Sequence, residues 1–269
     1  MVNIALTIEY DGSRYVGWQR QINGLSIQQV LEKVLQELLF EPVTLFGAGR
    51  TDAGVHALAQ VANFHTQKPL PPENLAFAMN NLLPKDIRIA QVDVMPEDFH
   101  ARYSAKVKTY RYLISTAKNN SVFVAPYVWQ LGKDLDLTAM GQAAQYFVGE
   151  HDFAAFSVTG SSVKSSIRMI TAVKIEQIKA RPCSDWQTVI DPIVIEVTAN
   201  GFLYKMVRLM VAYLVAIGLK KLEPESIKML LEQKEPPNIA PAPAQGLMLA
   251  RIEYPAQQNK VMPTGALGQ

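Results

Sequence analysis

The residues best suited to chemistry lie together in one glycine-rich segment, residues 47–57, which reads GAGRTDAGVHA. Its three glycines permit backbone conformations with positive φ and close approach by a ligand. The segment carries a guanidinium on Arg50 and a carboxylate on Asp52. Such a carboxylate can act as a nucleophile or a base if a neighbouring cation keeps it ionised and oriented. A polar turn closed by an Arg–Asp pair is the alternative, whereas the GxxxxGK[ST] pattern of a phosphate loop is absent.

A candidate for that cation is Arg208. The apolar segment 202–219 is predicted to be a buried helix, in which the only charged residues are Lys205 and Arg208, on one face with Tyr204. A buried guanidinium without an anionic partner costs several kcal/mol, so Arg208 is expected to meet a carboxylate. A purely structural ion pair, or an arginine that extends to solvent at the helix start, remains open.

A third segment, residues 106–114, reads KVKTYRYLI and is predicted to be a strand. Alternation then puts Lys108, Tyr110 and Tyr112 on one face and Thr109 and Arg111 on the other. Tyrosines interleaved with basic residues can stack on nucleobases and hold phosphates, although a half-buried strand with an aromatic core face shows the same pattern. The candidate phosphate contacts, each of which could instead be a solvated surface charge, are Arg14, Arg20, Lys106, Lys108, Arg111, Arg168 and Lys205.

The elements that must position these residues follow from apolar periodicity and turn residues. In the first half we expect strands at 2–10, 43–46, 59–66 and 87–94, a helix at 27–39 capped by Ser26, and a helix from 69–72 to about 81. In the second half we expect strands at 106–116, 163–178, 188–198 and 246–254, and helices at 138–148, 202–219 and 225–233.

This order predicts an α+β fold of two halves, residues 1–104 with the Asp52 segment and residues 105–254 with the tyrosine-rich strand and the basic helix. Residues 255–269 are expected to form a flexible tail. The two halves have a similar order of strands and helices, but their sequences show no residue-level repeat.

Composition excludes several classes of function. Of the 269 residues, 49% are hydrophobic and 19% charged, as in a globular protein with a substantial core, and the net charge of +2 neither requires nor excludes a nucleic-acid partner. Cys183 is the only cysteine and the four histidines are scattered, so no disulfide or metal site is expected. No secretory signal is evident, and the longest apolar run, 209–219, is too short to cross a bilayer. The single cysteine fits a reducing cytoplasm.

Taken in order, these segments resemble the tRNA pseudouridine synthase A family. GAGRTDAGVHALAQV is similar to the family's RTDxGVHA signature, and YDGSRYVGWQRQ, KTYRYLI, GFLYKMVR, GEHDFAAFS and APAQGLMLARIEY are similar to its other motifs. The resemblance covers roughly residues 3–254. It implies the pseudouridine synthase fold, with two ferredoxin-like-related halves, mixed and mostly antiparallel sheets, and flanking helices.

The resemblance also implies roles for single residues. Asp52 matches the catalytic aspartate, Arg208 its ion-pair partner, Tyr110 the tyrosine that stacks on the target uracil, and Arg50 the arginine proposed to replace the flipped base. It further implies isomerisation of uridine to pseudouridine at tRNA positions 38–40 without a cofactor, by a homodimer that holds the anticodon arm. Ala59 stands where many members have glycine, just outside the loop.

Three alternatives remain open at the level of sequence. A non-catalytic RNA-binding protein would use Tyr110 and Tyr112 as a stacking platform but would give Asp52 no task. A pseudouridine synthase acting on another RNA would share every motif. An aspartate-nucleophile hydrolase or phosphotransferase would need further carboxylates, and the pair Asp134 and Asp136 lies far from the loop in sequence.

Overall fold

The computed structural model describes residues 1–68, 70–118, 122–158, 165–178, 191–233 and 238–255. The chain separates into two compact units. The N-terminal unit comprises Met1–Lys108 and the residues from Leu249 onward, and the C-terminal unit comprises Thr109–Met248. The last strand therefore contributes most of its residues to the unit in which the chain begins.

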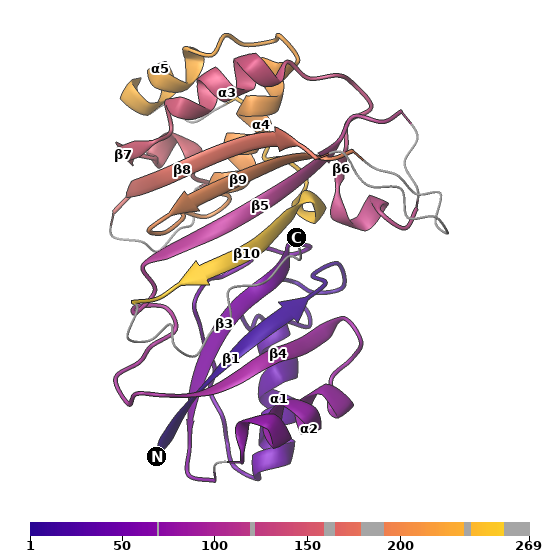
Figure 1. Cartoon of the computed structure of the whole chain (residues 1–269), viewed down its shortest axis with the longest axis vertical. Coiled ribbons are helices and arrows are strands. Elements are labelled where there is room, and N and C mark those ends of the chain that lie inside the picture. Colours follow the sequence, from indigo (N-terminus) through magenta and orange to yellow (C-terminus); the bar gives the residue numbers. More distant parts are fainter. Residues whose placement is uncertain (69, 119–121, 159–164, 179–190, 234–237, 256–269) are drawn as a thin grey trace. The chain divides into compact units, whose positions relative to one another are not determined.

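The sheet of the N-terminal unit is organised around β1, which pairs antiparallel with β3 on one side and β4 on the other (Figure 1). In this register Leu6 of β1 lies opposite Ala62 and Val92, and all three are buried. The strand order in this unit is β4-β1-β3-β10, and β2 pairs with β3. The strands are β1 (Val2–Tyr10), β2 (Phe46–Gly47), β3 (His56–Thr66), β4 (Ile87–Met95) and β10 (Leu247–Glu253).

Two helices accompany this sheet, α1 (Ile27–Leu39) and α2 (Pro72–Leu82). Helix α1 begins where the Ser26 hydroxyl accepts a hydrogen bond from the Gln29 amide at 3.2 Å, as the sequence predicts. Helix α2 begins at a proline, whose fixed φ suits the first helical turn. The two helices contact each other, and α2 packs against β4.

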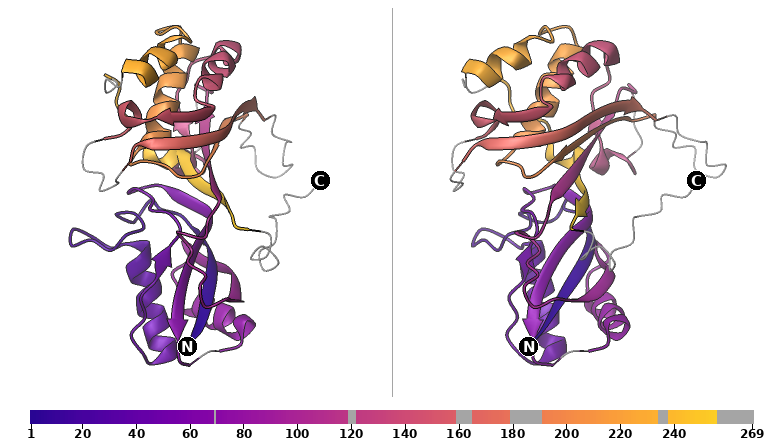
Figure 2. Two further views of the ribbon diagram at one scale, coloured as in Figure 1. Left: turned by 90° about the vertical axis from the view of Figure 1, so that its left-hand side faces the viewer. Right: turned by 60° about the vertical axis from the view of Figure 1, so that its left-hand side comes forward.

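The C-terminal unit has a sheet in the order β5-β9-β8-β7, with β6 parallel to β5. Strand β8 pairs antiparallel with both β7 and β9. Helix α3 packs against α4 and β8, and α3, α4 and α5 lie together above this sheet (Figures 1 and 2). The elements are β5 (Val107–Ser115), β6 (Trp129–Gln130), α3 (Leu137–Gln145), β7 (Gly149–Asp152), β8 (Ile167–Gln177), β9 (Ile193–Ala199), α4 (Met206–Gly218), α5 (Ser226–Gln233) and the short 3₁₀ helices Ala125–Tyr127, Ala154–Phe156 and Ala244–Gly246.

The mixed α+β class and the mostly antiparallel pairing confirm the predicted fold class. The expected strands at 2–10, 87–94 and 106–116 and the helix at 27–39 agree with β1, β4, β5 and α1 to within a residue at each end. Strand β3 begins three residues earlier than predicted, at His56, inside the glycine-rich segment. Parts of the strands predicted at 163–178 and 188–198, and the tail from residue 256, lie outside the described residues.

Several predicted elements are wrong in their bounds, and for two of them the reason is identifiable. The strand predicted at 43–46 is absent before Phe46, because side chains of α1 bind the backbone of Leu45: Glu32 accepts its amide at 3.0 Å, and Gln28 donates to its carbonyl at 3.2 Å. The helix predicted at 202–219 begins only at Met206, because Lys205 adopts a left-handed conformation with φ 59°. Within the part of the chain that the structure describes, no helix has both the length and the apolar character that a bilayer span requires.

Candidate active site

Asp52 lies in the connection between β2 and β3, in the N-terminal unit. It is half-buried, and its backbone forms an isolated antiparallel bridge with Gly17. The amide of Val55 donates to the Asp52 carbonyl at 3.1 Å, which closes a turn that contains Gly54 at φ +77°. The carboxylate is therefore presented by a short, hydrogen-bonded turn rather than by an open loop.

The segment that precedes Asp52 is held by hydrogen bonds from three directions. The Ala48 amide donates to the Val61 carbonyl at 2.8 Å. The side chain of Gln60 binds Gly49 twice, because its amide nitrogen donates to the Gly49 carbonyl at 2.8 Å and its oxygen accepts the Gly49 amide at 3.3 Å. The ammonium of Lys108 donates to the Ala48 carbonyl at 2.6 Å. Gln60 is fully buried, so these contacts give the segment a fixed path.

Thr51, the residue next to Asp52, is also fixed on two sides. Its hydroxyl shares a 2.8 Å hydrogen bond with the Tyr10 hydroxyl, and its carbonyl accepts the Trp18 amide at 3.1 Å. Burial raises the pKa of Tyr10 well above its usual range, although the hydrogen bond with Thr51 acts in the opposite direction. Tyr10 is thus a neutral hydroxyl that orients Thr51.

The N-terminal motif supplies the close contacts around this turn. A Cβ on Gly17, whose φ is +107°, would lie 2.4 Å from the Thr51 carbonyl oxygen, and a Cβ on Gly12 would lie 2.0 Å from the Val55 carbonyl oxygen. The Gly12 amide also donates to Nδ1 of His56 at 3.1 Å. The role of these two glycines and of Gln60 was missed at the level of sequence, where the glycine spacing in YDGSRYVGW was the available signal.

The other candidate site residues of the N-terminal unit are basic, and they differ in their hydrogen bonds and ion pairs. Arg50 is exposed, and its guanidinium has no hydrogen bond or ion pair among the described residues. Arg14 forms a 3.3 Å ion pair with Asp86. Lys108 is occupied by the Ala48 carbonyl, so it supports the Asp52 segment directly.

In the C-terminal unit, Tyr110 and Arg111 lie on opposite faces of β5, as alternation predicts. Tyr110 is buried, and its ring meets that of Phe202 edge to face, with centroids 5.0 Å apart. Arg111 donates to Glu196 on β9, with nitrogen–oxygen distances of 2.9 and 2.7 Å. Tyr112 is fully buried and donates its hydroxyl proton to the Pro243 carbonyl at 2.8 Å, so it belongs to the core and not to a surface stacking platform.

Arg208 is the one residue of α4 that is not buried. Its Nε donates to the Ala242 carbonyl at 2.7 Å, and the Ala242 amide donates to the Arg208 carbonyl at 3.0 Å. Its charge also acts on Tyr112: burial raises the pKa of that phenol well above its usual range, and Arg208 works against the increase. The guanidinium is therefore oriented by the backbone around Ala242.

Lys205 does not lie on the helical face predicted for it. It precedes α4 in a left-handed conformation, and its ammonium lies 5.0 Å from the centroid of the Tyr204 ring. Tyr204 is likewise outside the helix and exposed. The shared helical face of Tyr204, Lys205 and Arg208 is thus corrected by the start of α4 at Met206.

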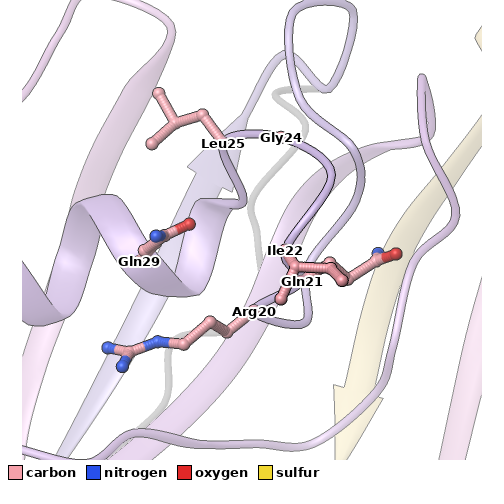
Figure 3. Close-up of a pocket in the computed structure, with 6 residues that line it drawn as sticks. All are labelled: Arg20, Gln21, Ile22, Gly24, Leu25 and Gln29. Atoms are coloured by element: carbon pink, nitrogen blue, oxygen red, sulfur yellow. The ribbon is translucent and has the colours of Figure 1, made fainter.

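A surface pocket of the N-terminal unit lies beside the turn from Arg20 to Leu25 (Figure 3). It is lined by Arg20, Gln21, Ile22, Gly24, Leu25 and Gln29. The charge of Arg20 is paired with Glu32, and the remaining lining groups are amides and hydrocarbon. This pocket therefore offers no acid or base for the chemistry expected of Asp52.

The carboxylates and histidines of the described residues form no group of three or more that could hold a metal ion. Asp136, one of the pair considered for metal-assisted chemistry, instead caps α3 by accepting the Ala139 amide at 3.0 Å.

Comparison with known proteins identifies the wider relationship. A family model described as tRNA pseudouridine synthase matches residues 6–104 and 143–255. A protein of Thermoanaerobacter sp. (strain X514) named tRNA pseudouridine synthase A is 42% identical over 255 residues, which cover 94% of this chain and all of that protein. Proteins of the same name from Acetivibrio thermocellus and Syntrophotalea carbinolica are 41% and 42% identical over 256 residues, again 94% of this chain and 100% and 97% of theirs. The chain belongs to the tRNA pseudouridine synthase family.

Proposed function

We propose that this protein converts uridine to pseudouridine at positions 38–40 of the tRNA anticodon arm, with Asp52 as the catalytic carboxylate. Family membership over nearly the whole chain supports the reaction and the tRNA substrate. The observation that carries the assignment of Asp52 is the fixed path of its segment, in which both Gly49 and Thr51 are hydrogen-bonded to buried side chains. A turn held in this way gives the carboxylate one orientation.

The reaction is an isomerisation. The N1–C1′ bond of uridine breaks, the uracil turns, and C1′ rebonds to C5, while C5 loses a proton and N1 gains one. No electron, donor group or water is consumed, so the carboxylate and its neighbours can carry the chemistry alone. Attack on C6, attack on C1′ and removal of the C2′ proton are all compatible with an ionised Asp52.

Arg208 is assigned as the ion-pair partner of Asp52. A guanidinium favours the ionised carboxylate and restricts its direction. Its hydrogen bond to the Ala242 carbonyl supports this role, because a cation already oriented by the backbone loses little freedom when it pairs. The two residues belong to different units of the chain, so the pairing is part of the proposal.

The uridine must leave the helical stack before it can react, at a cost of a few kcal/mol. Arg50 is exposed and can occupy the space that the everted base leaves. Tyr110 is assigned to stack on the uracil, and its edge-to-face contact with Phe202 supports a fixed ring plane. Lys205, Arg14 and Arg111 complete the substrate-binding residues in the proposal, with Arg14 and Arg111 exchanging or sharing their present carboxylate partners. Lys108, which was also expected to bind substrate, is instead assigned to the Ala48 carbonyl.

The family resemblance also supports three broader parts of the proposal. The protein acts as a homodimer, its two subunits together hold the anticodon arm, and it works in the cytoplasm. An RNA-binding protein without activity is less well supported, because it would give no function to Asp52 in its hydrogen-bonded turn.

The test is Asp52→Asn, which keeps the size of the side chain and removes the ionised carboxylate. We expect no detectable pseudouridine in an unmodified tRNA transcript, by tritium release and by position-resolved mass spectrometry, while tRNA affinity changes little. The matched control is Asp134→Asn, at an exposed aspartate of the C-terminal unit, which should retain wild-type turnover. Substantial pseudouridine from the Asp52→Asn protein would remove Asp52 from its role, and modification outside positions 38–40 would correct the specificity.

A further inference from the structure

Three aromatic rings of the N-terminal unit form a cluster that includes none of the residues assigned to the reaction. The ring of His100 lies 5.3 Å from that of Phe46 and 4.4 Å from that of Tyr103, measured between centroids. The guanidinium carbon of Arg102 lies 5.6 Å from the Tyr103 centroid. We call Phe46, His100, Arg102 and Tyr103 the aromatic cluster.

The outer members of the aromatic cluster face solvent. Tyr103 is 75% exposed and Phe46 is 43% exposed, while Arg102 is also exposed. The exposed rings of Phe46 and Tyr103 each contact the His100 ring but gain little of the burial that would stabilise the fold, so their arrangement is not explained by core packing. Their combination of ring faces with a guanidinium is typical of surfaces that bind unpaired nucleotides.

The backbone that presents the aromatic cluster is fixed by buried side chains. Asn3 donates to the Phe99 carbonyl at 2.8 Å, Asn63 accepts the Ala101 amide at 2.9 Å, and Tyr254 donates to the Ala101 carbonyl at 2.8 Å. Asn3, Asn63 and Tyr254 are each at most 2% exposed. Three buried polar groups from three strands or strand ends therefore hold a surface turn in one conformation, which reduces the entropy lost when a ligand binds.

Phe46 is positioned by the same asparagine. In the pairing of β2 with β3, Phe46 lies opposite Asn63, whose side chain binds the turn that carries His100. Phe46 also immediately precedes the segment of Asp52, and six residues can span at most about 20 Å. A ligand on the aromatic cluster is consequently within reach of a tRNA arm whose uridine is at Asp52.

His100 contributes a neutral ring rather than a charge. Its Nδ1 accepts the Arg102 amide at 3.1 Å, which leaves the ring proton on Nε2. Burial lowers the pKa of His100; a backbone hydrogen bond acts against this decrease, while the neighbouring charges of Arg102 and His65 add to it. The aromatic cluster therefore combines uncharged rings with one guanidinium, as stacking on a base beside a phosphate requires.

We propose that the aromatic cluster binds an unpaired nucleotide of the tRNA other than the uridine that reacts, by stacking its base on Tyr103 and Phe46 while Arg102 contacts its phosphate. This inference rests on the proposed function, since it takes tRNA as the ligand. It assigns these four residues to substrate binding and leaves the isomerisation itself to Asp52 and its neighbours.

The test compares variants of Tyr103 in their affinity for an unmodified tRNA transcript. Tyr103→Leu removes the ring but keeps an apolar side chain, and we expect about tenfold weaker binding. Tyr103→Trp keeps a stacking face and should bind as tightly as wild type, with quenching of the added tryptophan emission by tRNA. Phe77→Leu is the matched control, since Phe77 is a 71% exposed aromatic residue on α2 of the same unit, and it should change nothing.

A second measurement identifies the nucleotide. Single abasic sites are placed in turn through the unpaired loop of the anticodon arm, and each is tested with wild type and Tyr103→Leu. We expect one position at which the abasic site weakens wild-type binding but adds no further loss to Tyr103→Leu. Arg102→Gln should lower the slope of affinity against salt concentration by about one phosphate contact.

The proposal is overturned if Tyr103→Leu binds tRNA as wild type does, or if Phe77→Leu loses as much affinity as Tyr103→Leu. It is also overturned if Tyr103→Leu changes the oligomeric state measured by sedimentation without changing the tRNA affinity. The aromatic cluster would then be a contact between protein subunits. The proposed function fails separately, if the wild-type protein forms no pseudouridine in the same transcript.

Discussion

Two residues of β5 that lie close together in sequence are proposed to have different tasks. Tyr110 presents a ring whose plane is set by its edge-to-face contact with Phe202, and Lys108 places its ammonium on the Ala48 carbonyl. The first task depends on the face of a ring and the second on a hydrogen bond to backbone. Substitutions that remove one property at a time can therefore separate them.

For Tyr110 the relevant property is the ring face. Tyr110→Phe keeps the ring and its contact with Phe202, so we expect a large part of single-turnover pseudouridine formation to remain. Tyr110→Leu loses the face, and stacking worth about 1–3 kcal/mol predicts a loss of about tenfold or more. Equal rates for the two variants would contradict the stacking role.

For Lys108 the relevant property is the hydrogen bond. Lys108→Met keeps the aliphatic length but leaves the Ala48 carbonyl without the ammonium as its donor. This loss should destabilise the Asp52 segment by about 1–3 kcal/mol. We expect about a tenfold lower kcat for tRNA with nearly unchanged affinity. If Lys108 instead bound a phosphate, the salt slope of tRNA affinity would fall by about one contact while kcat stayed constant.

At the scale of elements, the turn of Asp52 depends on how closely the N-terminal motif can approach it. Gly17 is the clearest case, because its φ of +107° disfavours any side chain and a Cβ would lie 2.4 Å from the Thr51 carbonyl oxygen. We expect Gly17→Ala to lower the free energy of unfolding by about 1–3 kcal/mol and to reduce turnover further by moving Asp52.

The matched control is Gly141→Ala in α3, where a Cβ would meet nothing within 4 Å. An alanine inside a helix should raise the free energy of unfolding by about 0.5–1 kcal/mol. Urea denaturation of both variants, with turnover measured beside it, checks the pair. A Gly17→Ala protein with wild-type stability and turnover would show that the close approach is not required.

Elements that follow local periodicity were predictable from the sequence, and those set by distant partners were not. The alternation of β1 and the capped stripe of α1 are local patterns, and both were predicted with their observed ends. The backbone of Leu45 reads as a strand, but its hydrogen bonds go to Glu32 and Gln28 on α1. No local pattern reports such a partner.

The candidate site divides in the same way. The segment of Asp52 was recognisable because its glycines and its charged side chains are adjacent in sequence. The contact between Gln60 and Gly49, and the approach of Gly17 to Thr51, join residues that are distant or unremarkable in sequence. The start of α4 at Met206 was missed because helix propensity says nothing of a left-handed residue at Lys205.

At the scale of the whole molecule, the boundaries between the two units fall inside strands rather than in loops. One boundary lies between Lys108 and Thr109 in β5 and the other between Met248 and Leu249 in β10. Because the strands continue through both boundaries, the sequence has no turn-forming residues there that would mark the change of unit. The proposed reaction needs groups from both units, with Asp52 in one and Tyr110 and Arg208 in the other.

At the same scale, the carboxyl group of Asp93 should make the stability of the molecule depend on pH. Asp93 on β4 is 8% exposed; its Oδ1 accepts a hydrogen bond from Gln91 at 2.8 Å, and its Oδ2 has no partner among the described residues. Burial raises the pKa of Asp93 from 3.8 to about 6. Below the lower value both the folded and the unfolded chain hold the proton, and above the higher value neither does.

Between those two values the unfolded chain releases the proton first, so the contribution of Asp93 to the free energy of unfolding falls as the pH rises from about 4 to about 6. The fall is at most about 3 kcal/mol, from two pKa units at 1.36 kcal/mol each. Asp93→Asn cannot titrate and keeps the acceptor for Gln91, so its stability relative to wild type should increase across this window and then stay constant. Urea denaturation of both proteins at several pH values checks this, and parallel curves would show that Asp93 is ionised in the fold at little cost.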